Sequence, residues 1–159
     1  MAGICNYAGY AQNPVTVTFV FSHLLSQLDY EIVAESQAAA DAWGTLTYIK
    51  VTTPTSLDLD LNSNILTTNT DPVEQDLLSS LGNNAAVPIT TTYSAAGNVM
   101  ILPRSEQLML KIKTSSSDEM TIPTNLWNLA PGNIHKITLT FKGNATDIPI
   151  TATLSGWPE

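Results

Sequence analysis

The sequence predicts an all-β protein, built as a two-sheet antiparallel β-sandwich with one or two short helices. Charged residues make up only 13% of the chain, against about 25% in an average globular protein. Thr, Ser and Asn fill the gap, and short runs of alternating apolar and polar residues are bounded by Gly, Pro or Asn. That punctuation is typical of many strands joined by turns. A length of 159 residues with 43% apolar content fits a single domain core.

The first strand is predicted over residues 15–21, where apolar side chains recur at every second position. Such a period of two is typical of a strand with one buried face. The alternation breaks over residues 23–26 and resumes over residues 28–32. A bulge or short turn is therefore expected here, redirecting the chain toward the opposite sheet.

Two segments favour short helices. Residues 36–42 are rich in alanine and predict one helical turn. Asp71 and Pro72 stand where an N-cap and a first helical residue belong, and Glu74 can complete a capping box. This second helix would direct three leucines to the core and end at a glycine: Leu77, Leu78, Leu81 and Gly82.

The remaining apolar runs predict strands, to give about nine in total. They cover Thr45–Val51, Leu57–Leu61, Val87–Thr92, Asn98–Leu102, Leu108–Ile112, Ile134–Phe141 and Ile148–Leu154.

Charge and composition exclude several classes of function. Fourteen acidic and six basic residues give a net charge of -8, and the cations are scattered, so nucleic acid is not an expected partner. No apolar stretch approaches the roughly 20 residues of a membrane helix. Cys5 is the only cysteine, which excludes an intramolecular disulfide.

The two histidines, His23 and His135, are the first candidates for a catalytic base. Neither lies in a recognisable motif, and the sequence has no G-x-S-x-G, no H-E-x-x-H and no phosphate-binding glycine loop. Both histidines are therefore interpreted as packing or turn residues. No catalytic residue and no cofactor is predicted, and a hydrolase remains a minor alternative.

One acidic pattern has the spacing of a calcium loop. Asp58, Asp60 and Asn62 stand at alternate positions, but Ser63 and Asn69 occupy the places of the required glycine and bidentate glutamate. These residues are therefore interpreted as the exposed face of a strand, and no metal site is predicted.

Three tryptophans, Trp43, Trp127 and Trp157, have faces that could stack on sugar rings, although large aromatic residues more often belong to a core. A carbohydrate-binding β-sandwich module of a surface glycan-handling system, with Trp43 or Trp127 as its platform, is the main alternative function.

Residues 15–28 resemble the first conserved strand of the fimbrillin family, which comprises surface pilus subunits and adhesins of Bacteroides-type bacteria. The match rests on Phe19, Phe21, His23, Leu25 and Ser26.

Three later segments are also similar to this family: residues 99–103, 126–140 and 148–157. The residues that carry these matches are Pro103, Trp127, Pro131, Gly132 and Trp157. Arg104 and His135 depart from the family pattern. The resemblance implies that Pro131 and Gly132 form a tight turn before the next strand.

The resemblance implies a domain division. Residues 13–159 are similar to the second β-sandwich domain of fimbrillins, which is transthyretin-like with Greek-key connections, and residues 1–12 are expected to form a flexible segment. The family's first domain and lipoprotein signal have no counterpart in this sequence.

The resemblance also implies a non-enzymatic role, as a fimbrial subunit or adhesin domain at the cell surface and associated with the outer membrane. Its expected partners are other fimbrial subunits, joined by strand exchange, and host or bacterial surface ligands. The physical basis is that an open sheet edge offers unpaired backbone groups to an added strand.

Overall fold

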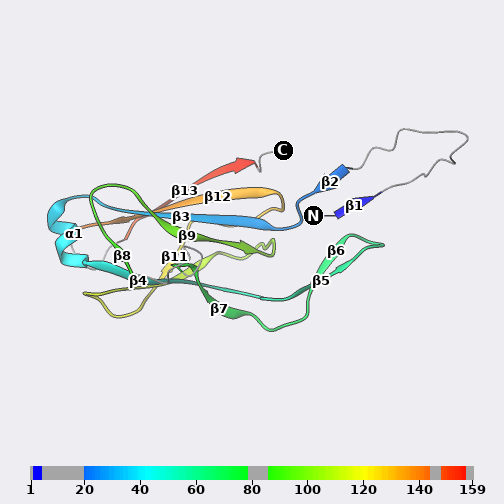
Figure 1. The fold of residues 1–159 in the computed structure, drawn as a ribbon, viewed down its shortest axis with the longest axis horizontal. Coiled ribbons are helices and arrows are strands. Elements are labelled where there is room, and N and C mark those ends of the chain that lie inside the picture. Colours follow the sequence, from blue (N-terminus) through cyan, green and yellow to red (C-terminus); the bar gives the residue numbers. More distant parts are fainter. Residues whose placement is uncertain (1, 5–19, 79–85, 144–147, 157–159) are drawn as a thin grey trace, which may run out of the picture.

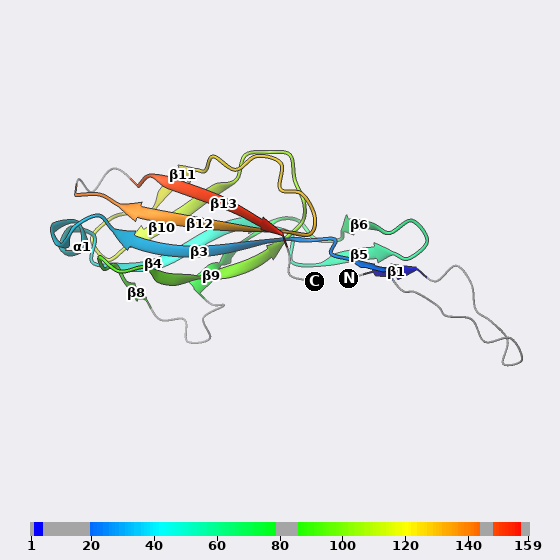
Figure 2. The same cartoon turned by 90° about the horizontal axis from the view of Figure 1, so that it is seen from above.

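The computed structural model describes residues 2–4, 20–78, 86–143 and 148–156. These residues form a mostly β protein with one short helix, α1 (Gln37–Trp43). Two larger sheets make up its body, and two small two-stranded sheets lie at the end opposite α1 (Figure 1). Figure 2 shows the same separation of α1 from the small sheets in a view from above.

The first larger sheet has four strands in the order β13 (Ile150–Gly156), β12 (Asn133–Phe141), β3 (Ser26–Ala34) and β9 (Ser94–Ile101). β12 and β3 are parallel, whereas the other pairs are antiparallel. The prediction of purely antiparallel sheets is therefore wrong for this pair. Parallel neighbours need a long crossover, and the chain provides it by passing through the other sheet between β3 and β12.

The second larger sheet has the order β11 (Met120–Pro123), β10 (Met109–Thr114), β4 (Thr45–Thr53) and β7 (Val73–Asp76). A fifth strand, β8 (Val87–Pro88), pairs with the beginning of β4. All of these pairs are antiparallel.

Both larger sheets contribute to one buried core. Alternate side chains of β3 and β12 are inaccessible to solvent, as are those of β4 and β10 from the other sheet. The predicted inward alternation after the Pro131 turn is confirmed, because Ile137, Leu139 and Phe141 are completely buried. Whether the sheets have the transthyretin-like Greek-key topology stays a prediction.

The helix α1 closes one end of the core, and it confirms the helical turn predicted for residues 36–42. The Ser36 hydroxyl caps the helix by accepting a hydrogen bond from the Ala39 N–H at 3.2 Å. Trp43 is completely buried, lies edge-on to Phe141, and donates from Nε1 to the Lys142 carbonyl at 2.6 Å. Gly44 ends the helix with a φ of 72°, a conformation that favours glycine.

The small sheets are β1 (Ala2–Ile4) with β2 (Val20–Ser22), and β5 (Leu57–Asp60) with β6 (Ile65–Thr68). β2 matches the end of the strand predicted over residues 15–21, and residues 15–19 lie outside the described part. The predicted break is confirmed, because β2 ends before His23 and β3 begins at Ser26 in another sheet.

The second predicted helix is wrong. Residues Val73–Asp76 form β7, which pairs with β4, and a short 3₁₀ turn follows at Leu77 and Leu78. Pairing with β4 satisfies the backbone groups of this segment along one edge, and Glu74 forms ion pairs with Lys50 of β4 and Lys111 of β10. Tertiary pairing thus outweighs the local capping signal. Leu77 and Leu78 are buried as predicted, whereas Leu81 and Gly82 lie outside the described residues.

Candidate functional site

The structure brings two of the predicted motifs together at the end of the body that carries the small sheets. The Ser26 hydroxyl donates to the Ala130 carbonyl at 2.7 Å, and the Gly132 N–H donates to the Leu25 carbonyl at 3.0 Å. Gly132 has a φ of 75° and lies against His23. Two segments far apart in the sequence are therefore fastened to each other by backbone and buried hydroxyl groups.

Pro103 belongs to the same region. Beside it, Arg104 and Leu129 exchange two backbone hydrogen bonds of 3.2 and 2.8 Å. Pro103 and Pro131 line one small cavity of about 280 Å³, together with Leu24, Asn64, Leu66 and Leu102. This arrangement joins the loops between strands and supports a structural role for the motif residues.

Trp127 does not belong to this cluster. Trp127 is 57% exposed on a loop between β11 and β12. Phe21 lies in β2, whereas Phe19 and Trp157 lie outside the described residues. Trp43 cannot be a sugar platform, because its indole is buried in the core, so that part of the carbohydrate prediction is wrong.

The two histidines occupy different environments. His23 lies partly exposed between β2 and β3, and His135 is buried on the inward face of β12. His135 Nε2 has no hydrogen-bond partner among the described residues, and burial lowers the pKa of His135. The imidazole is therefore held neutral near pH 7, in an environment that resembles a core position.

The aspartates of the calcium-like pattern serve the turn of the β5–β6 hairpin. Asp60 accepts hydrogen bonds from the Asn62 N–H and the Ser63 hydroxyl, both at 2.8 Å. These bonds lower the pKa of Asp60. Asp58 and Asp60 are exposed on β5, and the described residues hold no group of three or more His, Cys, Asp or Glu able to bind a metal ion.

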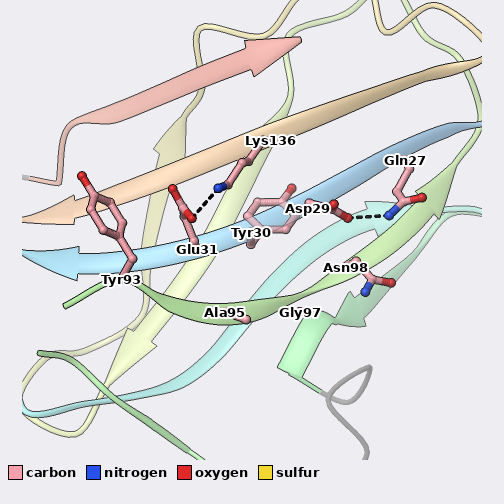
Figure 3. A pocket seen from close by; sticks show the side chains of 9 residues that line it. All are labelled: Gln27, Asp29, Tyr30, Glu31, Tyr93, Ala95, Gly97, Asn98 and Lys136. Carbon is pink, nitrogen blue, oxygen red and sulfur yellow. Dashed lines mark hydrogen bonds and ion pairs between the residues drawn. The ribbon is translucent and has the colours of Figure 1, made fainter. Parts of the chain in front are cut away.

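A pocket of about 340 Å³ lies on the outer face of the four-stranded sheet. We call it the Tyr93 pocket. Figure 3 shows Tyr93 at one end, and Gln27 and Asn98 at the other. The other lining residues come from β3, β9 and β12: Asp29, Tyr30, Glu31, Ala95, Gly97 and Lys136.

Strand register places three polar side chains of this pocket in one row. Asn98 of β9 is opposite Asp29 of β3, which is opposite Lys136 of β12. In the next row, Ala95 is opposite Glu31. The alternating core residues of β3 point the other way, so this row of polar groups faces outward.

A β-bulge shapes the floor of the Tyr93 pocket. The register between β3 and β9 shifts at Tyr30 and Glu31, and Gly97 opposite Tyr30 has a φ of 102°. An extra residue on one strand bends it locally. Gly97 has no side chain, and Ala95, two residues before it, has a small one; both line the pocket.

The charges of the Tyr93 pocket are ordered by hydrogen bonds. Glu31 binds Lys136 Nζ at 2.7 Å and accepts from the Thr138 hydroxyl at 2.7 Å. Burial raises the pKa of Glu31, but the hydrogen bonds to Lys136 and Thr138 and the Lys136 charge together outweigh this effect. The pKa of Glu31 therefore lies below its usual value. The hydrogen bond to Glu31 raises the pKa of Lys136. Asp29 accepts from Gln27 Nε2 at 2.5 Å.

Sequence reasoning missed this pocket. The polar positions of β3 alternate with its buried ones, which identifies an outward face. Lys136 and the segment at Tyr93 join that face only because β12 and β9 pair with β3 in their particular register. No local signal in the sequence specifies that register.

A layered, mostly β fold of this kind is common among cell-surface domains. Residues 1–157 match the Fimbrillin-like family, so the chain belongs to this family. The resemblance noted from the sequence motifs is thus confirmed.

Solved structures from Bacteroides share the fold. A protein from Bacteroides uniformis, proposed to act in cell adhesion, has a TM-score of 0.62 and 16% identity, over 88% of this chain and 53% of its own length. A fimbrial protein from Bacteroides vulgatus has a TM-score of 0.55 and 18% identity, over 88% of this chain and 56% of its own. At such identities the likeness shows the fold alone.

The chain therefore spans about half the length of the solved structures that it matches. No protein of curated function matches its sequence. The Fimbrillin-like family is one of non-enzymatic adhesion proteins. In the described part, no helix has the length and apolar character needed to cross a membrane.

Proposed function

We propose that this chain is a subunit of a cell-surface fimbrial or adhesive assembly, in which neighbours join by β-strand addition to the four-stranded sheet. Family membership supports the surface and assembly part of this proposal. The single observation that carries the mechanism is a difference between the edges of the two larger sheets.

The edge strands of the four-stranded sheet are β9 and β13, and neither contains a charged residue or a proline. The outer strands of the other sheet carry residues that oppose pairing with a further strand. β7 carries Glu74 and Asp76, and β11 ends at Pro123. Proteins commonly use charges and prolines to prevent strand pairing at an edge. The edges of the four-stranded sheet lack both, so they are the edges that can accept an added strand.

β9 is the better described of these two edges. Over Ser94–Ile101 it pairs with β3 on one side, and among the described strands none pairs with its other side. Its backbone N–H and C=O groups on that side can bind an extended segment of a neighbour, while Met100, 45% exposed, offers an apolar contact.

The proposal includes finer expectations carried by the resemblance. Residues 13–159 act as one domain equivalent to the second domain of fimbrillins, in an assembly associated with the outer membrane. The motif residues, including Ser26, Pro103, Pro131 and Gly132, act as structural joints and not as a ligand site.

The test compares two exposed methionines. Met100 is 45% exposed on the edge strand β9, and Met109 is 44% exposed on β10, which has a neighbour on both sides. A lysine on an edge opposes strand addition. Met100→Lys should weaken self-association of the full chain about tenfold, equivalent to about 1.4 kcal/mol, whereas Met109→Lys should leave it unchanged.

Sedimentation equilibrium and electron microscopy of the purified chain provide the measurement, with melting temperature as the control for folding. A wild-type chain that remains monomeric at every concentration would contradict the proposal, and so would equal assembly of the two folded variants. Immunogold labelling of intact cells tests the surface location separately.

A further inference from the structure

We propose that the Tyr93 pocket binds an uncharged saccharide. The pocket lies on the outward face of β9, β3 and β12, away from the core. Its volume of about 340 Å³ falls at the lower end of the range for small-molecule sites.

An aromatic wall is the first feature that a sugar requires. Tyr93 precedes β9 and remains 68% exposed, although most large aromatic residues bury their rings. Figure 3 shows its ring beside the carboxylate of Glu31, at one end of the polar row. The apolar C–H face of a pyranose can pack on such a ring while its hydroxyls point to the strands.

The polar row provides the second feature. Asp29 uses one oxygen to accept from Gln27, and a carboxylate has about four acceptor sites, so Asp29 can also accept from ligand hydroxyls. The Gln27 side chain adds a carbonyl acceptor next to it. A purely apolar ligand would remove these groups from water without replacing their hydrogen bonds, at a free-energy cost.

The charge of the pocket selects against acidic ligands. Asp29 and Glu31 contribute two negative charges and Lys136 one positive charge, and the ammonium is already paired with Glu31 at 2.7 Å. The protein as a whole carries a net charge of -8. A sialic acid or sulfated sugar would be repelled, so the ligand class is a neutral sugar or glycan end.

The side chains of the pocket are also preorganised in the absence of a ligand. Glu31 is fixed by Lys136 and Thr138, and Gln27 is fixed by Asp29. The bulge at Gly97 holds the floor open. Side chains that are ordered in advance lose less conformational entropy on binding.

The experiment is an NMR titration of the isotope-labelled full chain with the methyl glycosides of galactose, glucose, mannose, fucose and N-acetylglucosamine. N-acetylneuraminic acid serves as the acidic probe. At least one neutral glycoside should shift the amide signals of Ala95, Gly97 and Asn98, with a dissociation constant in the millimolar range, and the acidic probe should not.

The variants Tyr93→Ala and Asp29→Asn should each weaken this binding about tenfold. Tyr93→Phe should retain it, because the ring remains. Trp127→Ala is the matched control, since it removes an exposed aromatic residue outside the pocket, and it should bind like the wild type.

Three results would overturn the proposal. They are loss of binding in Trp127→Ala with retention in Tyr93→Ala, shifts caused only by the acidic sugar, or no shifts with any neutral glycoside at about 50 mM, a concentration roughly tenfold above a dissociation constant of a few millimolar. The proposal does not depend on strand addition. Met100→Lys is expected to weaken assembly and retain sugar binding, whereas Tyr93→Ala is expected to weaken sugar binding and retain assembly. The failure of one proposal is therefore distinguishable from the failure of the other.

Discussion

At the scale of single residues, buried polar groups differ in whether the fold satisfies them. The hydroxyl of Ser26 is completely buried and bonded to the Ala130 carbonyl. The Tyr30 hydroxyl and His135 Nε2 are buried without a hydrogen-bond partner among the described residues. A satisfied group stabilises the fold, whereas an unsatisfied one carries a desolvation cost.

Ser26→Ala tests the satisfied case. The variant removes the hydrogen bond that the buried Ser26 hydroxyl donates to the Ala130 carbonyl, so the free energy of unfolding should fall by about 0.5–1.5 kcal/mol. Urea denaturation followed by circular dichroism measures the change. Ser22→Ala, at an exposed serine, should change stability by less than about 0.5 kcal/mol, and an equal loss in both variants would contradict the proposed joint.

The buried, unsatisfied imidazole of His135 should make the stability of the fold depend on pH. Burial lowers its pKa in the folded protein from the ordinary value of 6.5, so below pH 6.5 the unfolded chain takes up a proton that the folded chain does not. Stability should therefore be fully present above this pH and decrease as the pH falls toward the folded pKa.

The measurement compares the free energy of unfolding at pH 8 and pH 5 for the wild type and His135→Phe. Carboxylates titrate in both proteins, so the difference between them isolates the imidazole. The variant should lose less stability on acidification. Identical losses would show that His135 is protonated equally in the folded and unfolded states.

At the scale of elements, strand pairing overrides a helical signal. Residues 71–74 have the order of a helix start, yet β7 forms because β4 offers it an edge and Glu74 meets two lysines. The helix α1 has no such competitor. There the Ser36 cap and the Gly44 terminus agree with the alanine-rich segment between them.

Gly44→Ala tests the end of α1. A residue other than glycine pays about 1–2 kcal/mol in the left-handed region, and an added Cβ would also collide with the Ser115 side chain. The unfolding free energy should fall by at least that amount in thermal or chemical denaturation. Gly143→Ala is the control, because its Cβ would make an ordinary contact at 3.7 Å from Glu35 Oε1, and a comparable loss there would refute the argument.

At the scale of the whole molecule, both larger sheets depend on one core, and Trp43, the last residue of α1, closes one end of it. Its indole is completely buried against Phe141. Trp43→Ala should cost about 3–5 kcal/mol, a large share of the 5–15 kcal/mol that stabilises a typical domain.

Denaturant unfolding monitored by circular dichroism measures this loss, and Trp127→Ala provides the comparison because Trp127 is 57% exposed. The exposed site should change by less than about 1 kcal/mol. Similar losses at the two tryptophans would mean that the core does not depend on Trp43 in the way described.

Much of the local structure follows from the sequence. The alternation in residues 28–32 and 137–141 predicts which side chains are buried, because a strand turns successive residues to opposite faces. Ser36 marks the start of α1 correctly. The short strands β1, β6, β7 and β11 were not predicted, because their polar or brief sequences carry little alternation.

The sequence by itself determined the mostly β composition, the inward faces of the main strands, the turn at Pro131 and Gly132, and the motifs of the Fimbrillin-like family. Only the tertiary structure decided that β3 lies parallel to β12, that residues 73–76 extend as a strand, and that Tyr93, Asp29 and Lys136 share one pocket. The physical reason is that the alternation of buried and exposed residues is a local property of the sequence, whereas backbone hydrogen bonds between strands are nearly independent of side-chain identity. Which strands become neighbours is therefore settled by packing the whole core at once.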